Sequence, residues 1–384
     1  MSPSRALLSS VRRVVVKLGT GVVTHGGEGV ALGRLHAIVE DLAGLRTRGV
    51  EVLLVSSGSV SMGARALQLH ERPRSLGVRQ ACAAVGQGQL LSLYSQAFGQ
   101  LGVTVAQVLL TQDDLGDRDR ALCLRTTLLR LLELGAIPVL NENDSVSVRE
   151  LVEHRKEALE GFGDNDGLSA LLAVAVDADA LVLMTDVDGL HTSNPATDPA
   201  AQRIDSLERI DEATRQRARG TSATGTGGMA SKLDAAAVAS EAGIPTLIVD
   251  GKTPAVTSRG LAGDSVGTVV WPQDRKSARK RNIAAGAPHC GALIANAGAL
   301  EALRTKKASL LPVGVLDVQG EFARGDVVEV RDASGRVHGR GLANYDAQAC
   351  RAMAGRQSAE LADILGYRGY DAVITRDNLA LTDV

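Results

Sequence analysis

Short runs of apolar, mostly β-branched residues recur along the first two thirds of the chain. Each run has the length of one buried strand. Together they predict seven strands: Val14–Lys17, Val50–Val55, Val103–Leu110, Ile137–Leu140, Ala180–Met184, Pro245–Val249 and Val266–Val270. Most runs are continuous rather than alternating, which is typical of strands buried on both faces of a parallel sheet.

Longer stretches with apolar residues at helical spacing lie between these runs. They predict five helices: Leu32–Arg48, Leu76–Phe98, Asp119–Leu134, Asp166–Val176 and Met229–Ala242. This alternation favours an α/β fold, a three-layer sandwich in which helices cover both faces of a mostly parallel central sheet. Ligands of such sheets bind beyond the carboxyl ends of the strands, so polar residues that directly follow a strand are the candidates for chemistry.

The pattern changes after Trp271. A basic cluster followed by small residues predicts a solvent-exposed linker over residues 273–306, between a first domain of residues 1–272 and a last domain of residues 307–384. The last domain reads as short strands with an accompanying helix over Asp346–Leu365, and it predicts a small β-barrel-like fold. Its expected turns are Asp317–Gly320, Arg324–Asp326 and Asp332–Gly335.

Composition narrows the function classes. A chain of 384 residues fits two domains. A net charge of −2 and an aromatic content of 2% argue against binding to nucleic acid or to anionic membranes as the main function. The four cysteines are scattered, and neither a signal peptide nor a membrane-length apolar run stands out. We therefore expect a cytoplasmic protein with reduced thiols.

Two strand ends carry groups suited to phosphate. Lys17 stands where the first strand meets the turn Gly19–Gly21, either as a lysine that reaches solvent or as a cation aimed at phosphate. The stretch GTGGMASK, Gly225–Lys232, joins a glycine turn, a lysine and a helix start. It is not a P-loop, because Ala230 and Ser231 precede its lysine. Ser57 and Gly58 end the second strand as a helix cap or as a close approach to a ligand.

Carboxylates and amides gather at two further places. The string NENDSV, which begins at Asn141 and contains Asp144, suits the zwitterion of an α-amino acid. Asp164, Asn165 and Asp166 begin a helix, and a buried carboxylate there would hold Lys17 or Lys232 in place. Thr185, Asp186 and Asp188 follow another strand without a specific metal-ligand spacing, and the seven histidines show no metal pattern either.

Six strings, taken in order, resemble the amino acid kinase family: VVVKLGT, VSSGSV, IPVLNENDSV, FGDNDGLSA, LMTDVDGL and GTGGMASK. The tail ASLLPVGVLDVQGEFARGDVVEV is similar to the PUA domain that many bacterial members carry. The resemblance covers nearly the whole chain. It departs from the common pattern at GLHTSNP, where His191 and Asn194 are atypical and leave the nucleotide-side loop open.

The resemblance implies roles for particular residues. Lys17 and Lys232 would bind the transferring phosphoryl group and Asp166 would organise them, as the catalytic set. Ser57, Asn141, Asp144 and Asn165 would bind the substrate. Mg²⁺ would accompany ATP, whose contacts would be Lys17, Thr185, Asp186, Thr226, Gly227, Gly228, Met229, Ala230, Ser231 and Lys232.

The resemblance also implies a reaction, the ATP-dependent phosphorylation of the γ-carboxylate of L-glutamate, with L-proline as inhibitor of this first step of proline biosynthesis. A carboxylate is already ionised at neutral pH, so the reaction needs positioning and charge neutralisation rather than a general base. Carbamate, acetylglutamate, aspartate and a nucleotide stay open as alternative acceptors, although Asp144 and Asn141 favour a free amino group. We expect a homo-oligomer, and we do not expect RNA binding by the tail to be the primary function.

Overall fold

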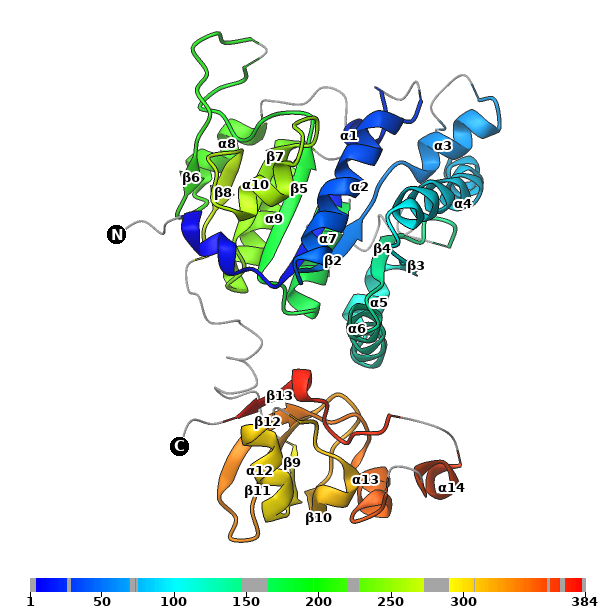
Figure 1. Ribbon diagram of the computed structural model, residues 1–384, viewed down its shortest axis with the longest axis vertical. Helices are drawn as coiled ribbons and strands as arrows, with labels where there is room; N and C mark the ends of the chain where they lie inside the picture. Colours follow the sequence, from blue (N-terminus) through cyan, green and yellow to red (C-terminus); the bar gives the residue numbers. More distant parts are fainter. Residues whose placement is uncertain are drawn as a thin grey trace. The chain divides into compact units, whose positions relative to one another are not determined.

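The computed structural model describes residues 5–25, 29–69, 73, 75–146, 165–195, 197–219, 228–272, 290–306, 308–357, 360–366 and 370–381. The chain forms two compact units, Met1–Arg275 and Lys276–Val384, which Figure 1 shows in sequence colours. The end of the first domain that the sequence predicts, at residue 272, stays a prediction.

An eight-stranded sheet forms the centre of the first unit, with the strand order β3-β4-β2-β1-β5-β7-β8-β6. Neighbouring strands are parallel except for β7 and β8. The strands are β1 (Arg13–Leu18), β2 (Glu51–Val55), β3 (Val105–Leu110), β4 (Ile137–Glu142), β5 (Ala180–Thr185), β6 (Ser206–Leu207), β7 (Thr246–Asp250) and β8 (Thr268–Val270). All seven predicted strands are therefore confirmed, and the short β6 is additional.

Five long helices of this unit begin and end within two residues of their predicted bounds: α2 (Leu32–Thr47), α4 (Leu76–Gln100), α6 (Arg118–Glu133), α7 (Asn165–Ala175) and α9 (Met229–Glu241). Shorter helices join them: η1 (Arg5–Ser10), α1 (Thr20–Val23), α3 (Ser59–Ala66), α5 (Gln112–Gly116), α8 (Glu212–Arg219) and α10 (Val256–Leu261). Within the described residues, no helix is long and apolar enough to cross a membrane.

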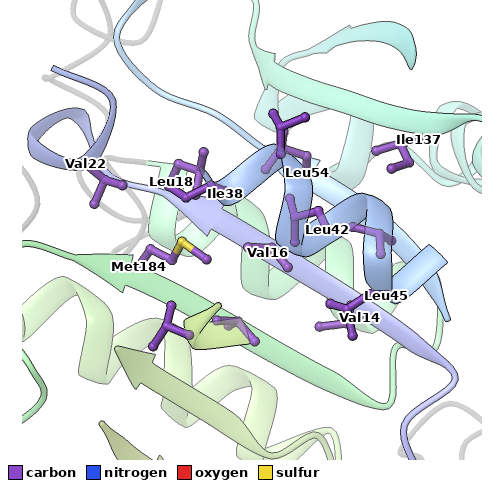
Figure 2. Packing of buried hydrophobic residues seen from close by; sticks show 14 of the residues in the cluster. Val14, Val16, Leu18, Val22, Ile38, Leu42, Leu45, Leu54, Ile137 and Met184 are labelled. Carbon is purple, nitrogen blue, oxygen red and sulfur yellow. The ribbon is translucent and has the colours of Figure 1, made fainter. Parts of the chain in front are cut away.

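One face of the sheet packs against α2, α4 and α10. Alternate residues of β1 (Val14, Val16 and Leu18) join the apolar side chains of these helices in one buried cluster, part of which Figure 2 shows around Leu42 and Met184. Because successive side chains of a strand point to opposite faces, Lys17 points away from this cluster.

The other face of the sheet is covered by α7 and α9. These two helices pack against each other, α7 contacts β1, β4 and β5, and α9 contacts β5 and β7. Helices on both faces confirm the predicted three-layer arrangement. Lys17 is thus placed under the amino-terminal ends of α7 and α9, on a strand that lies in the middle of the sheet.

The second unit has a five-stranded sheet with the order β10-β9-β11-β12-β13. Its elements are β9 (Gly291–Ala295), α12 (Ala297–Thr305), η3 (Pro312–Gly314), β10 (Val315–Gly320), β11 (Val327–Arg331), β12 (Val337–Leu342), α13 (Ala347–Met353), α14 (Leu361–Leu365), η5 (Arg376–Asn378) and β13 (Leu379–Leu381). Buried residues of these strands and helices form a core of their own.

Three details of this unit differ from the sequence expectation. The predicted linker reached residue 306, but β9 and α12 belong to the sheet unit because their apolar residues are buried in its core. Asp317–Gly320, expected as a turn, lies in β10, and the left-handed Gly320 at φ 80° ends that strand. The helix expected over Asp346–Leu365 is two helices, and Gly355 at φ 73° lies between them.

Candidate active site

Two lysines and one aspartate form a buried cluster where β1 meets α7 and α9. Lys17 Nζ lies 2.6 Å from Asp166 Oδ1, and Lys232 Nζ lies 3.1 Å from Asp166 Oδ2. The three residues are 5%, 0% and 4% exposed in the order Lys17, Asp166, Lys232. The sequence placed a carboxylate near one lysine or the other, and the structure brings it to both.

The charges of this cluster do not cancel. Burial raises the pKa of the Asp166 carboxyl, but the positive charges of Lys17 and Lys232, with hydrogen bonds from Lys17 and Ser231, outweigh burial and hold the pKa below its usual range. Asp166 is therefore ionised at neutral pH. Two ammonium groups around one carboxylate leave one excess positive charge among these three side chains, in surroundings of low polarity where it would attract an anion strongly.

The amino-terminal ends of α7 and α9 add partial positive charge to this cluster. Asp166 is in the first turn of α7 and Lys232 in that of α9, whose N-cap is Gly228. Ser231 Oγ lies 2.8 Å from Asp166 Oδ2 and 2.9 Å from the Gly228 carbonyl, and these two acceptors share its single O–H group. The amino-terminal ends of helices carry partial positive charge and unpaired N–H groups, so both ends favour a phosphate at this point.

The end of β1 is held close to β5 by a glycine. Gly19 N donates to the Met184 carbonyl at 3.2 Å, and a Cβ at Gly19 would lie at 3.2 Å from the same oxygen. A Cβ at residue 19 would therefore be tight against β5 and would be in ordinary contact with the Lys17 ammonium, 3.9 Å away. The glycine turn after the first strand thus keeps the space around Lys17 clear.

Amide side chains form a second group beside the charged cluster. Asn165 Nδ2 lies 2.9 Å from each of three acceptors, Ser57 Oγ, the Ser56 carbonyl and Asn141 Oδ1, and its two N–H groups are shared among them. Asn141, 2% exposed at the end of β4, in turn donates to Gln87 and Ser59. Asn165 directly precedes Asp166, so the two groups share one helix start. Three of the four predicted substrate residues, Ser57, Asn141 and Asn165, are in contact.

Asp144, the fourth predicted substrate residue, is half-buried just beyond β4. Burial raises the pKa of its carboxyl to about 6, helped by the negative charge of Glu142, while Arg79 and a hydrogen bond from Ser59 act in the opposite direction. Ser59 also accepts from Asn141, so Asp144 is connected to the amide group. A carboxylate with a raised pKa gains from a cationic partner, and the ammonium of an amino acid is one.

The nucleotide-side residues lie at the end of β5. Thr185 Oγ1 donates to Asp186 Oδ1 at 3.2 Å, and the Asp186 carbonyl accepts from Lys252 Nζ at 3.0 Å. Gly228, Met229, Ala230 and Ser231 form the N-cap and first turn of α9. Thr226 and Gly227 lie outside the described residues. Asp188 does not join the cluster, because its carboxylate contacts His191 at 3.2 Å.

Sequence reasoning missed the contribution of α3 and α4. Gln87 accepts from Asn141 at 2.8 Å, Ser59 accepts at 3.2 Å, and Tyr94 shares a 2.8 Å hydrogen bond with Ser56. Gln87 and Tyr94 are seven residues apart, two helical turns on one side of α4. The sequence shows this seven-residue spacing, but other polar residues of α4 have similar spacings, so the spacing does not single out Gln87 and Tyr94.

Comparison with known proteins agrees with this geometry. The model of the amino acid kinase family matches residues 12–250 and that of the PUA domain matches residues 291–365. The chain belongs to the amino acid kinase family. Among its relatives, a glutamate 5-kinase of Syntrophotalea carbinolica is 43% identical over 377 residues, 98% of this chain and 98% of the relative. A glutamate 5-kinase of Carboxydothermus hydrogenoformans is 44% identical over 381 residues, 99% of this chain and 100% of that relative.

Among solved structures, a UMP kinase of Bacillus anthracis is 17% identical and covers 69% of this chain and 97% of its own, with a TM-score of 0.47.

Proposed function

We propose that this chain transfers the γ-phosphoryl group of ATP to the γ-carboxylate of L-glutamate and forms L-glutamyl 5-phosphate. The buried cluster of Lys17, Asp166 and Lys232 carries this proposal, because it concentrates positive charge next to amides suited to an amino acid. The glutamate 5-kinases that match this chain over nearly its whole length support the choice of acceptor.

The proposed roles follow from charge. Lys17 and Lys232 neutralise the oxygens of the transferring group. The negative charge of Asp166, which contacts both lysines, offsets the repulsion between their ammonium groups. The γ-carboxylate of glutamate is the nucleophile, and it needs no base because it is ionised at neutral pH. The product is an acyl phosphate, and ADP leaves.

The acceptor residues would bind the other end of glutamate. Asp144 and Asn165 bind the ammonium, and Ser57 binds the α-carboxylate next to it. Thr185, Asp186 and the start of α9, from Gly228 to Ser231, line the nucleotide side in this proposal. We place Thr226 and Gly227 there as well, from the family resemblance alone.

Mg²⁺ belongs to the proposal as the ion that arrives with ATP. Lysines bind both oxygens of Asp166. The site therefore fits an ion held by phosphate oxygens better than one held by this carboxylate. Among the described residues there is no group of three or more His, Cys, Asp or Glu side chains that could hold a metal. Bound Mg²⁺ would neutralise phosphate charge during transfer.

L-Proline, as a product-pathway inhibitor, would share the acceptor pocket. Proline and glutamate have the same α-carboxylate and a cationic nitrogen, so Asp144 would bind either one. Proline has no γ-carboxylate and cannot react. The same proposal includes a place in proline biosynthesis, a homo-oligomeric state and a cytoplasmic location, where ATP is supplied.

A panel of acceptors tests the function. ATP turnover is measured with L-glutamate, L-aspartate, N-acetyl-L-glutamate and carbamate at equal concentrations, and we expect kcat/KM to be highest for L-glutamate by at least about tenfold, the value of one lost polar contact. A higher kcat/KM with N-acetylglutamate would mean that the pocket does not bind a free ammonium. Turnover with a nucleoside monophosphate alone would place the chain in another branch of the family.

A further inference from the structure

The amide of Asn141 has no hydrogen-bonding capacity left over. Its Nδ2 donates to Gln87 Oε1 at 2.8 Å and to Ser59 Oγ at 3.2 Å, which uses both N–H groups. Its Oδ1 accepts from Asn165 Nδ2 at 2.9 Å and from Glu142 N at 3.0 Å, which uses both lone pairs. A substrate could contact this amide only by breaking one of the four bonds. Asn141 therefore binds neighbouring residues of the protein rather than the substrate.

Gln87 and the Glu142 N–H together hold the Asn141 amide in one orientation. The contact with Gln87 at 2.8 Å joins an N–H group to a carbonyl oxygen, and the Glu142 N–H donates to Asn141 Oδ1 at 3.0 Å. If Asn141 were turned over, its nitrogen would face the Glu142 N–H and its oxygen would face Gln87 Oε1, two repulsive contacts in a site that is 2% exposed at Asn141. The accepting oxygen of Gln87 on α4 thus supports the orientation that the Glu142 N–H sets.

The orientation of the Asn141 amide also bears on Asn165 and Ser57, the residues proposed to bind the substrate. Asn165 presents its Nδ2 to Asn141 Oδ1, to the Ser56 carbonyl and to Ser57 Oγ, each at 2.9 Å, and all three contacts require the same amide orientation. Ser57 Oγ accepts this bond, so its own O–H can donate outward. Asn165 Oδ1 is buried, and no group among the described residues donates to it. The two ends of the network are therefore one acceptor and one donor.

An amino acid zwitterion matches these two ends. Its ammonium donates, as Asn165 Oδ1 requires, and its carboxylate accepts, as the Ser57 hydroxyl requires. Asn141 contacts Asn165, whose Oδ1 faces this ligand, and Gln87 contacts Asn141. Recognition of the zwitterion thus draws on a residue that does not touch it.

Close packing of two helices places Gln87 at this point. A Cβ at Gly86 would lie 1.8 Å from the Ser59 carbonyl, and one at Gly63 would lie 1.7 Å from the Cys82 carbonyl. The backbones of α3 and α4 therefore touch at these glycines. This contact sets Gln87 next to the start of α3, from which Ser59 also reaches Asn141.

We propose that Gln87 is a positioning residue of the acceptor site, which acts through Asn141 to orient Asn165 and Ser57 toward an α-amino acid. The inference rests on the proposed function for the identity of that amino acid as L-glutamate. In it, Asn141 is a relay between α4 and the ligands, in place of the ligand role that the family resemblance implied.

Two variants of equal length separate the accepting oxygen from the packing. Gln87→Met removes the acceptor and Gln87→Glu keeps one. Gln89→Met is the matched control, because Gln89 is exposed two residues further along the same helix. We expect Gln87→Met to raise the KM for L-glutamate about tenfold, the value of one hydrogen bond. The KM for ATP should stay within about twofold, Gln87→Glu should recover most of the loss, and Gln89→Met should resemble the wild type.

A double variant tests whether Gln87 acts through Asn141. Asn141→Ala and Asn141→Ala with Gln87→Met should have the same KM for glutamate, because the relay is broken once. Effects that multiply, an unchanged KM in Gln87→Met, or equal losses for glutamate and ATP would overturn the proposal. A wild-type protein without glutamate turnover would instead refute the proposed function, and the same variants are then compared with the amino acid that it does phosphorylate.

Discussion

In the proposed reaction, Lys17 and Lys232 are the residues on which phosphoryl transfer depends most. Lys17→Ala and Lys232→Ala should each lower kcat by roughly a hundredfold or more, as the loss of an electrostatic stabiliser of the transition state does. Steady-state turnover with saturating ATP and glutamate measures this. Lys306→Ala is the control, since Lys306 is an exposed lysine of the second unit. Turnover near the wild-type rate in either folded lysine variant would remove that lysine from the mechanism.

Asp144 should give glutamate binding a pH dependence. Its carboxyl pKa is raised to about 6, so the carboxylate is present at pH 7.5 and is mostly protonated below pH 6. A protonated acid no longer attracts an ammonium. We therefore expect the KM for glutamate and the inhibition constant for proline to rise together as the pH falls through about 6, while the KM for ATP changes little.

The variant Asp144→Asn isolates this effect. It should raise both constants at pH 7.5, and the remaining pH dependence between pH 5.5 and 7.5 should be flat, because an amide does not titrate in this range. Initial rates and proline titrations at several pH values measure both constants. A variant that loses glutamate affinity but keeps full proline sensitivity would place proline in another pocket.

At the scale of elements, the contact of α3 with α4 supports the acceptor site. Gly86→Ala should destabilise the protein by about 1–3 kcal/mol or more, because its Cβ has no room against the Ser59 carbonyl. Gly88→Ala is the matched control, since a Cβ there meets nothing within 4 Å. It should be neutral or stabilising by about 0.5–1 kcal/mol, since alanine favours helix. Denaturant unfolding compares the two, and equal stabilities would contradict this packing.

The same elements explain what the sequence could predict. Continuous apolar runs defined β1, β2, β4 and β5 because these strands are buried on both faces. Strand ends pointed to Lys17 and Asp144, and a helix start pointed to Asp166. The role of α4 was not predictable, because Gln87 and Gln89 look alike in a helical pattern and Gly86 reads only as a weak helix former. The roles of Gln87 and Gly86 follow from the contact of α4 with α3.

At the scale of the whole molecule, the predicted catalytic residues all lie in the unit Met1–Arg275. A protein that ends at Arg275 should therefore keep turnover that depends on ATP and glutamate, within a few-fold of the full chain's kcat. Circular dichroism establishes that it is folded before rates are compared. Complete loss of activity in a folded truncation would mean that the second unit completes the active site.

The second unit also has fewer available cations than its arginine content indicates. Arg331 and Arg340 both bind the buried carboxylate of Glu329, at 2.6 and 2.9 Å. Arginines engaged in this way contribute less to a phosphate-binding surface. That RNA binding is not the primary function of this chain stays a prediction.

The identity of the phosphorylated carboxyl group distinguishes the proposed reaction from its alternatives most directly. The full chain is incubated with ATP, Mg²⁺, L-glutamate and hydroxylamine, which converts an acyl phosphate to a hydroxamate, and the hydroxamate is compared with authentic α- and γ-glutamyl hydroxamates. We expect the γ-isomer in amounts equal to ADP, and we expect no γ-isomer from the variant Asp166→Ala. The α-isomer, or ADP without a glutamyl hydroxamate, would contradict the proposed reaction.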